Sequence, residues 1–278
     1  MKLGLVCEGG GMRGVFTAGV LEVFMEENFY PDEVIGVSAG ASNTVSYVAK
    51  QKGRCYRTNV DYFGDKRYVS MENLIKTGSM FGMDFLFGEL PNKLDPFDRE
   101  TFFANSCEYY AGATDVMTGK VKFFGKEDMD EAFTPLRASC SLPLVGNVIP
   151  YCGRKYMDGG IGDSIPIKKA LDDGCDQVIL ILTRERGYVK KAQKGAFIYK
   201  LLYKKYPGLL HAMKNRHIEY NKTLKYIKKL ERKGKVIVIA PPQPLPVGRV
   251  AKNKDDLLKA YAVGRKMGKK FLENYKSC

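Results

Sequence analysis

The chain has 278 residues, of which 45% are hydrophobic and 27% are charged, and its formal net charge is +14. This composition is typical of a folded globular protein and excludes a disordered chain. The length suits one large core, so we expect a single domain over residues 1–278. The apolar run at the start ends at Glu8, too early for a signal peptide or a membrane span, and we expect a cytoplasmic protein.

The positive charge is concentrated in the last third of the chain. Residues 188–278 hold 24 Lys and Arg against 5 Asp and Glu, whereas residues 1–187 hold 21 against 26. This basic C-terminal part indicates peripheral contact with an anionic membrane surface. The alternative is a solvated helical face whose apolar stripe packs on the body. No recognised motif favours a specific nucleic-acid partner.

The cysteines and histidines give no sign of a metal centre. The chain has 7 cysteines and 2 histidines, and no Cys-x-x-Cys pair is present. Zinc sites are built from closely spaced cysteines and histidines, so the sequence predicts no metal site.

The first part of the chain alternates short strands with helices. Lys2–Cys7 predicts a buried strand, Glu8–Gly14 a glycine-rich turn and Val15–Glu27 a helix. Glu33–Val37 then predicts a second strand, and Ala39–Gln51 a helix of small residues. Such alternation predicts an α/β layered fold around a mostly parallel sheet.

Residues Arg54–Phe103 interrupt that alternation with an apolar stretch punctuated by glycines. Two interpretations of residues 77–92 stay open: a loop packed under the core, and a mobile lid that lines an acyl-chain pocket. The elements predicted further along are a hairpin of Glu108–Thr114 and Lys120–Phe124, buried strands at Gln177–Thr183 and Val236–Ala240, and a last helix at Lys254–Tyr275.

A serine stands between the second predicted strand and the helix that follows. Ser38 lies in the sequence Gly-Val-Ser-Ala-Gly, which runs from Gly36 to Gly40. A nucleophilic serine must hold its hydroxyl clear of the backbone, and such a strained turn tolerates only small neighbours. Ser38 is therefore the candidate nucleophile.

A glycine-rich turn follows the first predicted strand. Its residues are Gly9, Gly10, Gly11, Met12, Arg13 and Gly14. Consecutive glycines leave backbone N–H groups free to converge on an anion, so Gly9–Met12 is a candidate oxyanion hole. The turn also matches the dinucleotide-binding fingerprint, which makes a nucleotide-binding oxidoreductase an alternative. That fingerprint needs an acidic residue at the end of the second strand, where this chain has Ser38.

A third motif supplies a candidate base. Asp158 precedes Gly159 and Gly160, and a carboxylate can take the role that the scarce histidines would otherwise fill. His211 lies in a Lys-rich helical stretch, where exposed surface histidines are expected. The chain order Ser38, Asp158, His211 nevertheless suits a triad, so both a dyad and a triad stay open.

In this order, the motifs at Gly9–Gly14, Gly36–Gly40 and Asp158–Gly160 resemble the patatin-like phospholipase family. The resemblance covers residues 3–183 and includes Ala138–Pro143 and Gly159–Pro166. It implies a three-layer α/β/α sandwich that hydrolyses acyl esters of lipids without a metal or cofactor.

The resemblance also implies a role for each motif. Ser38 is the nucleophile, Asp158 the general base, and the Gly9–Met12 backbone the oxyanion hole. Two interpretations of Arg13 stay open: it forms a surface salt bridge, or its positive charge lies near the oxyanion. Since an ordinary aspartate, with a pKa of about 4, is a weak base at neutral pH, we expect Asp158 to be partly desolvated. A non-catalytic binder of anionic lipid surfaces is a further alternative.

Overall fold

The computed structural model describes residues 1–193 and 195–276. Its 8-stranded sheet has the order β5–β6–β3–β2–β1–β7–β8, and β4 pairs with β3 off this path. The strands are β1 (Leu3–Cys7), β2 (Glu33–Val37), β3 (Glu108–Asp115), β4 (Val121–Phe124), β5 (Ile149–Tyr151), β6 (Arg154–Asp158), β7 (Gln177–Ile181) and β8 (Val236–Ile239). The pairs among β1, β2, β3, β7 and β8 are parallel, whereas β3–β4, β3–β6 and β5–β6 are antiparallel.

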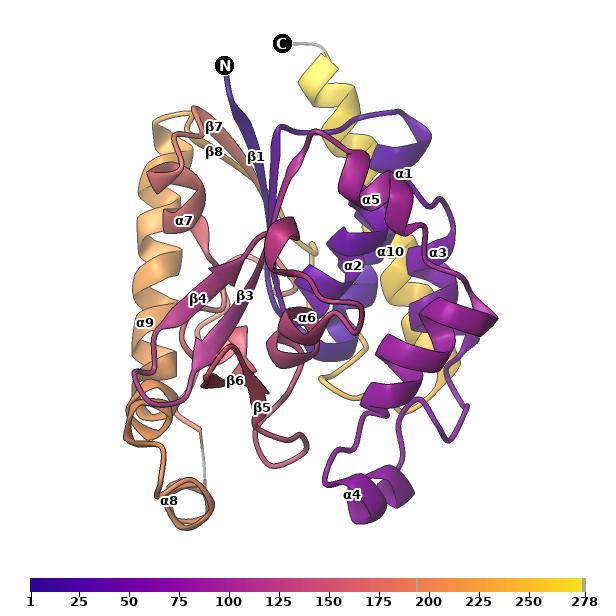
Figure 1. Cartoon of the computed structure of the whole chain (residues 1–278). Helices are drawn as coiled ribbons and strands as arrows, with labels where there is room; N and C mark the ends of the chain where they lie inside the picture. The colour runs from indigo at the N-terminus through magenta and orange to yellow at the C-terminus, as the bar shows by residue number, and fades with distance from the viewer. Residues whose placement is uncertain (194, 277–278) are drawn as a thin grey trace.

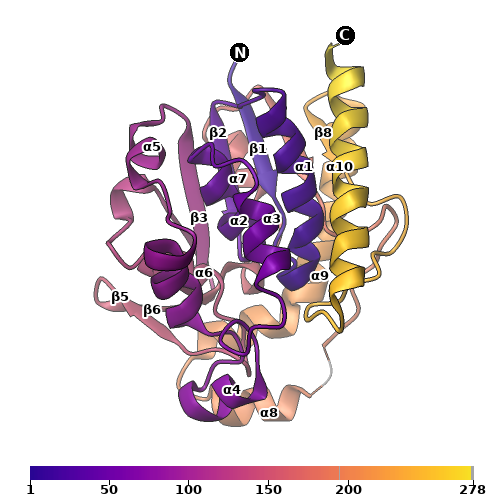
Figure 2. The same cartoon turned by 90° about the vertical axis from the view of Figure 1, so that its right-hand side faces the viewer.

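Helices cover both faces of the sheet (Figures 1 and 2). One face carries α1 (Gly14–Glu26), α2 (Ala39–Val48) and α10 (Lys254–Lys276), and the other carries α7 (Ile167–Asp172) and α9 (Pro207–Arg232). Successive side chains of β1 point to opposite faces of the sheet, so β1 packs against the helices of both layers. Leu5 packs in a cluster with Phe16 of α1, whereas Val6 packs with Tyr220 of α9. The predicted three-layer α/β/α sandwich is confirmed.

Shorter elements fill the connections between these layers. The helices are α3 (Arg54–Tyr56), α4 (Met71–Thr77), α5 (Arg99–Ala104), α6 (Thr134–Ser139) and α8 (Ala196–Leu202). The 3₁₀ turns are Gly11–Arg13, Lys126–Asp128 and Gly159–Ile161, and π-helical turns occupy Arg57–Asp61 and Phe85–Leu94.

Most predicted elements are confirmed with small changes at their ends. The helix predicted to reach Gln51 ends at Val48, because Lys50 adopts a left-handed φ of 54°. The hairpin of β5 and β6 was not predicted. Its strands are short and partly charged, and they turn through Cys152 and Gly153, which both have positive φ.

The basic C-terminal part is built into the sandwich. It supplies β8 to the sheet, α9 to one face and α10 to the other. The buried residues of α9 are Leu209, Met213, Tyr220, Ile227 and Leu230. The interpretation of a helical face with an apolar stripe packed on the body therefore holds for α9. Within the part of the chain that the structure describes, no helix is long and apolar enough to span a bilayer.

Candidate active site

Ser38 lies in a sharp turn between β2 and α2. Its backbone has φ 54° and ψ −129°, a strained conformation for a residue other than glycine. Gly36 and Gly40 allow the turn to pack tightly. A Cβ on Gly40 would lie 2.4 Å from the carbonyl oxygen of Cys7, and one on Gly36 would lie 2.5 Å from the backbone of Ala41. Any larger residue at either position would displace the start of α2.

Ser139, at the end of α6, holds this turn in place. The Ser38 N–H donates to Ser139 Oγ at 2.9 Å, and that hydroxyl donates to the carbonyl oxygen of Gly112 at 2.6 Å. Ser139 is fully buried. The sequence placed it only within a stretch that resembles the family. Its contact with Ser38 bridges 101 positions of the chain, which no local pattern predicts.

Asp158 ends β6 and is buried beside Ser38. Its Oδ1 accepts a hydrogen bond from the Gly160 N–H at 2.9 Å. Its Oδ2 is also buried and has no hydrogen-bond partner of regular geometry among the described residues. Burial raises the pKa of Asp158, while the interaction with the Ser38 hydroxyl and the positive charge of Arg216 oppose that rise. The carboxylate is thus desolvated, as expected, and one oxygen is free to accept a proton.

The glycine-rich turn offers fewer free donors than its sequence suggested. The Gly9 N–H donates to the Ser164 carbonyl oxygen at 3.3 Å, and the Met12 N–H donates to that of Arg249 at 3.0 Å. The N–H groups of Gly10 and Gly11 have no acceptor among residues 1–193 and 195–276. The structure therefore narrows the candidate donors from four to these two.

Gly11 and Gly14 are required by their surroundings. Gly11 has a φ of +57°, and a Cβ there would lie 2.7 Å from the Arg249 carbonyl oxygen. A Cβ on Gly14 would lie 2.6 Å from the Cβ of Ala39, so Gly14 allows the turn to pack against α2.

Arg13 does not form the surface salt bridge that was one of its two interpretations. Its side chain is 6% exposed, and its Nε is buried with no partner in the described residues. Burial and the positive charges of Arg184 and Arg249 lower the pKa of Arg13 to about 10. It is a buried cation within the glycine-rich turn.

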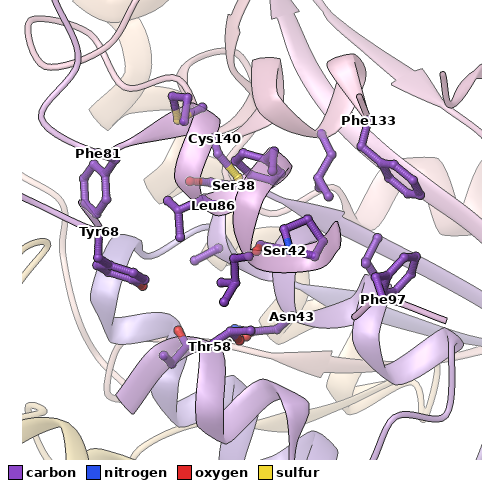
Figure 3. Close-up of a pocket in the computed structure, with 18 of the residues that line it drawn as sticks. Ser38, Ser42, Asn43, Thr58, Tyr68, Phe81, Leu86, Phe97, Phe133 and Cys140 are labelled. Carbon is purple, nitrogen blue, oxygen red and sulfur yellow. Dashed lines mark hydrogen bonds between the residues drawn. The ribbon is translucent and has the colours of Figure 1, made fainter. Parts of the chain in front are cut away.

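A large apolar cavity opens beside Ser38. The space within it and at its solvent-open mouth together measures about 1050 Å³, and Gly11, Met12, Ser38 and Ala39 contribute to its wall. Tyr68 and Phe81 lie on one side of it, and Phe97 and Phe133 lie on the other (Figure 3). Further lining residues are Ser42, Asn43, Thr58, Leu136, Cys140 and Leu142. The cavity is mainly aromatic and aliphatic, so it suits an apolar ligand.

Residues 77–92 form one wall of this cavity. The side chains that line it are Phe81, Met83, Leu86, Phe87, Leu90 and Pro91. Two ion pairs tie the segment to its neighbours: Asp84 with Arg137 at 2.9 Å and Glu89 with Arg67 at 2.6 Å. The segment lines the pocket and is also packed on the body, since Phe85 and Leu90 are buried, so it has features of both interpretations.

Among the described residues, neither histidine forms a hydrogen bond with Ser38 or Asp158. His211 is exposed on α9, and its Nε2 lies 3.0 Å from the side-chain nitrogen of Asn215. His217 lines a different cavity. Neither histidine is among the groups that shift the pKa of Asp158. The structure brings together the serine and the aspartate without a histidine.

Two family models match the chain. The patatin-like phospholipase model matches residues 5–171, and a domain of unknown function, DUF6363, matches residues 206–278. The uncharacterized protein YjjU of Escherichia coli (strain K12) is 27% identical over 278 residues, which are 98% of this chain and 77% of that protein.

The fold is similar to that of VipD from Legionella pneumophila. The crystal structure of VipD aligns with a TM-score of 0.50 and 12% sequence identity, over 98% of this chain and 67% of that one. At this identity the likeness bears on the fold alone. Neither of the two family models describes a dinucleotide-binding oxidoreductase. Because the phospholipase model covers more than half of the sequence, the chain belongs to the patatin-like phospholipase family.

Proposed function

We propose that this protein hydrolyses carboxylic esters of lipids, with Ser38 as nucleophile and Asp158 as general base. One observation carries the proposal. The strained Ser38 turn interacts with a buried carboxylate that has a free oxygen, at the wall of a large apolar cavity. A nucleophile, a base and an apolar substrate pocket are the parts that lipid ester hydrolysis requires.

The first half of the reaction acylates the serine. Ser38 Oγ attacks the ester carbonyl carbon while its proton passes to Asp158 Oδ2. The carbonyl oxygen becomes an oxyanion, which the free N–H groups of Gly10 and Gly11 are suited to stabilise. Each such donor typically lowers the barrier by about 3 kcal/mol. When the tetrahedral intermediate collapses, protonated Asp158 returns its proton to the leaving alcohol.

The second half releases the fatty acid. Asp158 takes a proton from a water molecule, whose oxygen attacks the acyl carbon on Ser38. The ester bond to Ser38 breaks, and the serine oxygen recovers the proton from Asp158. A raised pKa suits this residue, because the same group must act as base and then as acid in each half of the reaction.

Fatty acid release from mixed micelles of a glycerolipid tests this reaction directly. We expect turnover without added metal or cofactor. Binding to lipid vesicles without release of fatty acid from any ester would instead support the non-catalytic alternative.

Replacing His211 by Ala separates a dyad from a triad. The exposed position of His211 on α9 predicts wild-type kcat and KM for the variant. Steady-state hydrolysis of a glycerolipid gives both values. Removing a general base usually lowers kcat by about 100-fold or more, so a loss of that size would show that His211 belongs to a catalytic triad.

Peripheral membrane contact is supported by two helices at the end of the molecule that lies away from the N-terminus (Figures 1 and 2). Parallel β1 and β2 end toward the same side, so Ser38 faces this end too. Large exposed apolar side chains on these helices are Met71 and Ile75 on α4, and Phe197, Ile198, Leu201 and Leu202 on α8. The same region is basic: Lys200 lies within α8, and Lys204 and Lys205 follow it closely in the sequence. We propose that this apolar and basic surface enters an anionic bilayer.

Ile198→Asp tests that surface. Ile198 is 50% exposed on α8, and a carboxylate there would be repelled by anionic lipid. We expect weaker co-sedimentation with vesicles that contain phosphatidylserine. The matched control is Ile218→Asp on α9, where Ile218 is 44% exposed. Equal loss of binding in both variants, or no loss in either, would contradict the assignment of α8.

A further inference from the structure

A second cavity, lined by positive charge, adjoins the candidate active site. The space within it and at its solvent-open mouth together measures about 540 Å³. Six cationic side chains line it: Arg13, Arg184, Lys190, Lys191, Arg216 and Arg249. They come from the glycine-rich turn, the loop after β7, helix α9 and the loop before α10. Segments far apart in the sequence therefore place their charges around one space.

These cations lack carboxylate partners. Among residues 1–193 and 195–276, none of the six forms an ion pair. The buried carboxylate of Glu8 acts electrostatically on Arg13, but both its oxygens are already engaged. One accepts from the Tyr220 hydroxyl at 2.7 Å, and the other accepts from the N–H and hydroxyl of Thr183 at 2.6 and 3.0 Å.

The six cations repel one another, and hydrogen bonds hold at least one of them, Lys190, in place. Burial and the charges of Arg216 and Arg249 lower the pKa of Lys190 to about 7, and the buried Nε of Arg13 has no partner. The backbone of Lys190 is fixed by two hydrogen bonds with the Asn221 side chain. Of the six cations only Arg13 is buried, whereas Arg184, Lys190 and Arg216 are partly buried and Lys191 and Arg249 are exposed. A bound anion would relieve the repulsion among these like charges.

The cationic cavity and the apolar cavity have no lining residue in common, but neighbouring residues line them. Gly11 and Met12 line the apolar cavity, and the next residue, Arg13, lines the cationic one. Arg249 accepts the Met12 N–H at its carbonyl oxygen. The guanidinium of Arg216 donates to the Gly160 carbonyl oxygen. Arg216 and Arg249 also lie close enough to Asp158 to oppose the rise of its pKa, so the cationic cavity is a neighbour of the candidate active site.

We propose that the cationic cavity binds a doubly charged phosphate group, the phosphomonoester head of the lipid whose ester is cleaved at Ser38. This inference rests on the proposed hydrolase function. Guanidinium groups bind phosphate oxygens through paired hydrogen bonds, and four of the six cations are arginines. A phosphomonoester carries close to two negative charges at neutral pH. It therefore matches the excess positive charge better than a singly charged phosphodiester does.

Calorimetry with the Ser38→Ala protein tests this proposal without turnover. The probes are dihexanoylglycerol phosphate, its choline phosphodiester counterpart and inorganic phosphate. We expect the phosphomonoester lipid to bind most tightly. Adding Arg184→Gln and Arg249→Gln should weaken its binding by about tenfold or more. The matched control, Lys228→Gln at an exposed position of α9, should leave the binding unchanged.

Three results would overturn the proposal: equal affinity for the two lipids, unchanged affinity in the arginine variant, or inorganic phosphate bound as tightly as the phosphomonoester lipid. The last would make the cavity a site for free phosphate. A protein with Arg184→Lys and Arg249→Lys is the control for misfolding. It keeps the positive charges, so it should keep the preference for the phosphomonoester lipid. Failure of the hydrolase function appears separately, as wild-type protein that binds lipid and releases no fatty acid.

Discussion

Replacing Ser38 by Ala is expected to lower kcat for lipid ester hydrolysis by about 10⁴-fold or more. Without its hydroxyl the chain has no group at the β2–α2 turn that can form an acyl-enzyme. In the proposed mechanism Asp158 acts on the proton of the Ser38 hydroxyl, so Asp158 has no proton to accept from the variant. Fatty acid release under saturating substrate gives kcat for both proteins.

The matched control for this experiment is Ser106→Ala. Ser106 is exposed ahead of β3, so its loss should alter neither kcat nor Tm. Since alanine is no more strained than serine at φ 54°, Ser38→Ala should also keep the wild-type Tm. Turnover by Ser38→Ala within a few-fold of wild type would remove Ser38 as the nucleophile.

Replacing Asp158 by Asn is expected to lower kcat by about 10⁴-fold, because a neutral amide cannot take the serine proton. The same substitution should raise the Tm at neutral pH. Burial raises the pKa of Asp158, so the folded state disfavours its charged form. That penalty is fully present above the folded pKa and fades as the pH falls through it. Asparagine carries no such charge and removes the penalty.

Thermal unfolding of both proteins across a pH series checks the stability effect. The gain in Tm of Asp158→Asn over wild type should be largest at neutral pH and vanish at acidic pH. The kcat/KM of the wild type should also fall on the acid side above the ordinary aspartate pKa of about 4. A lower Tm for Asp158→Asn at neutral pH would show that the charged carboxylate stabilises the fold.

The sequence was most informative where local pattern and tertiary role agree. The apolar run of β1 and the small residues of α2 predicted both elements, since their burial follows directly from their composition. The β5–β6 hairpin was missed because Pro150, Arg154 and Lys155 hide any strand alternation. Of its two strands, β6 pairs with β3, a contact that no local window contains, and β5 pairs with β6.

The candidate site likewise has features that the local sequence predicts and features that depend on distant residues. Ser38 and Asp158 could be named from their glycine neighbours, because those glycines serve the local turn. The engagement of the Gly9 and Met12 N–H groups could not be predicted, since their acceptors lie on Ser164 and Arg249, far along the chain. The cationic cavity was equally hidden, because its charges come from four separate segments.

A fluorophosphonate probe tests the assignment of Ser38 most directly, since it reacts with an activated serine and requires no knowledge of the natural lipid. Peptide mass spectrometry after labelling should find one adduct, on the peptide that contains Ser38, and the Ser38→Ala protein should remain unlabelled. An adduct on a different serine, or labelling of the variant at the wild-type rate, would contradict Ser38 as the nucleophile.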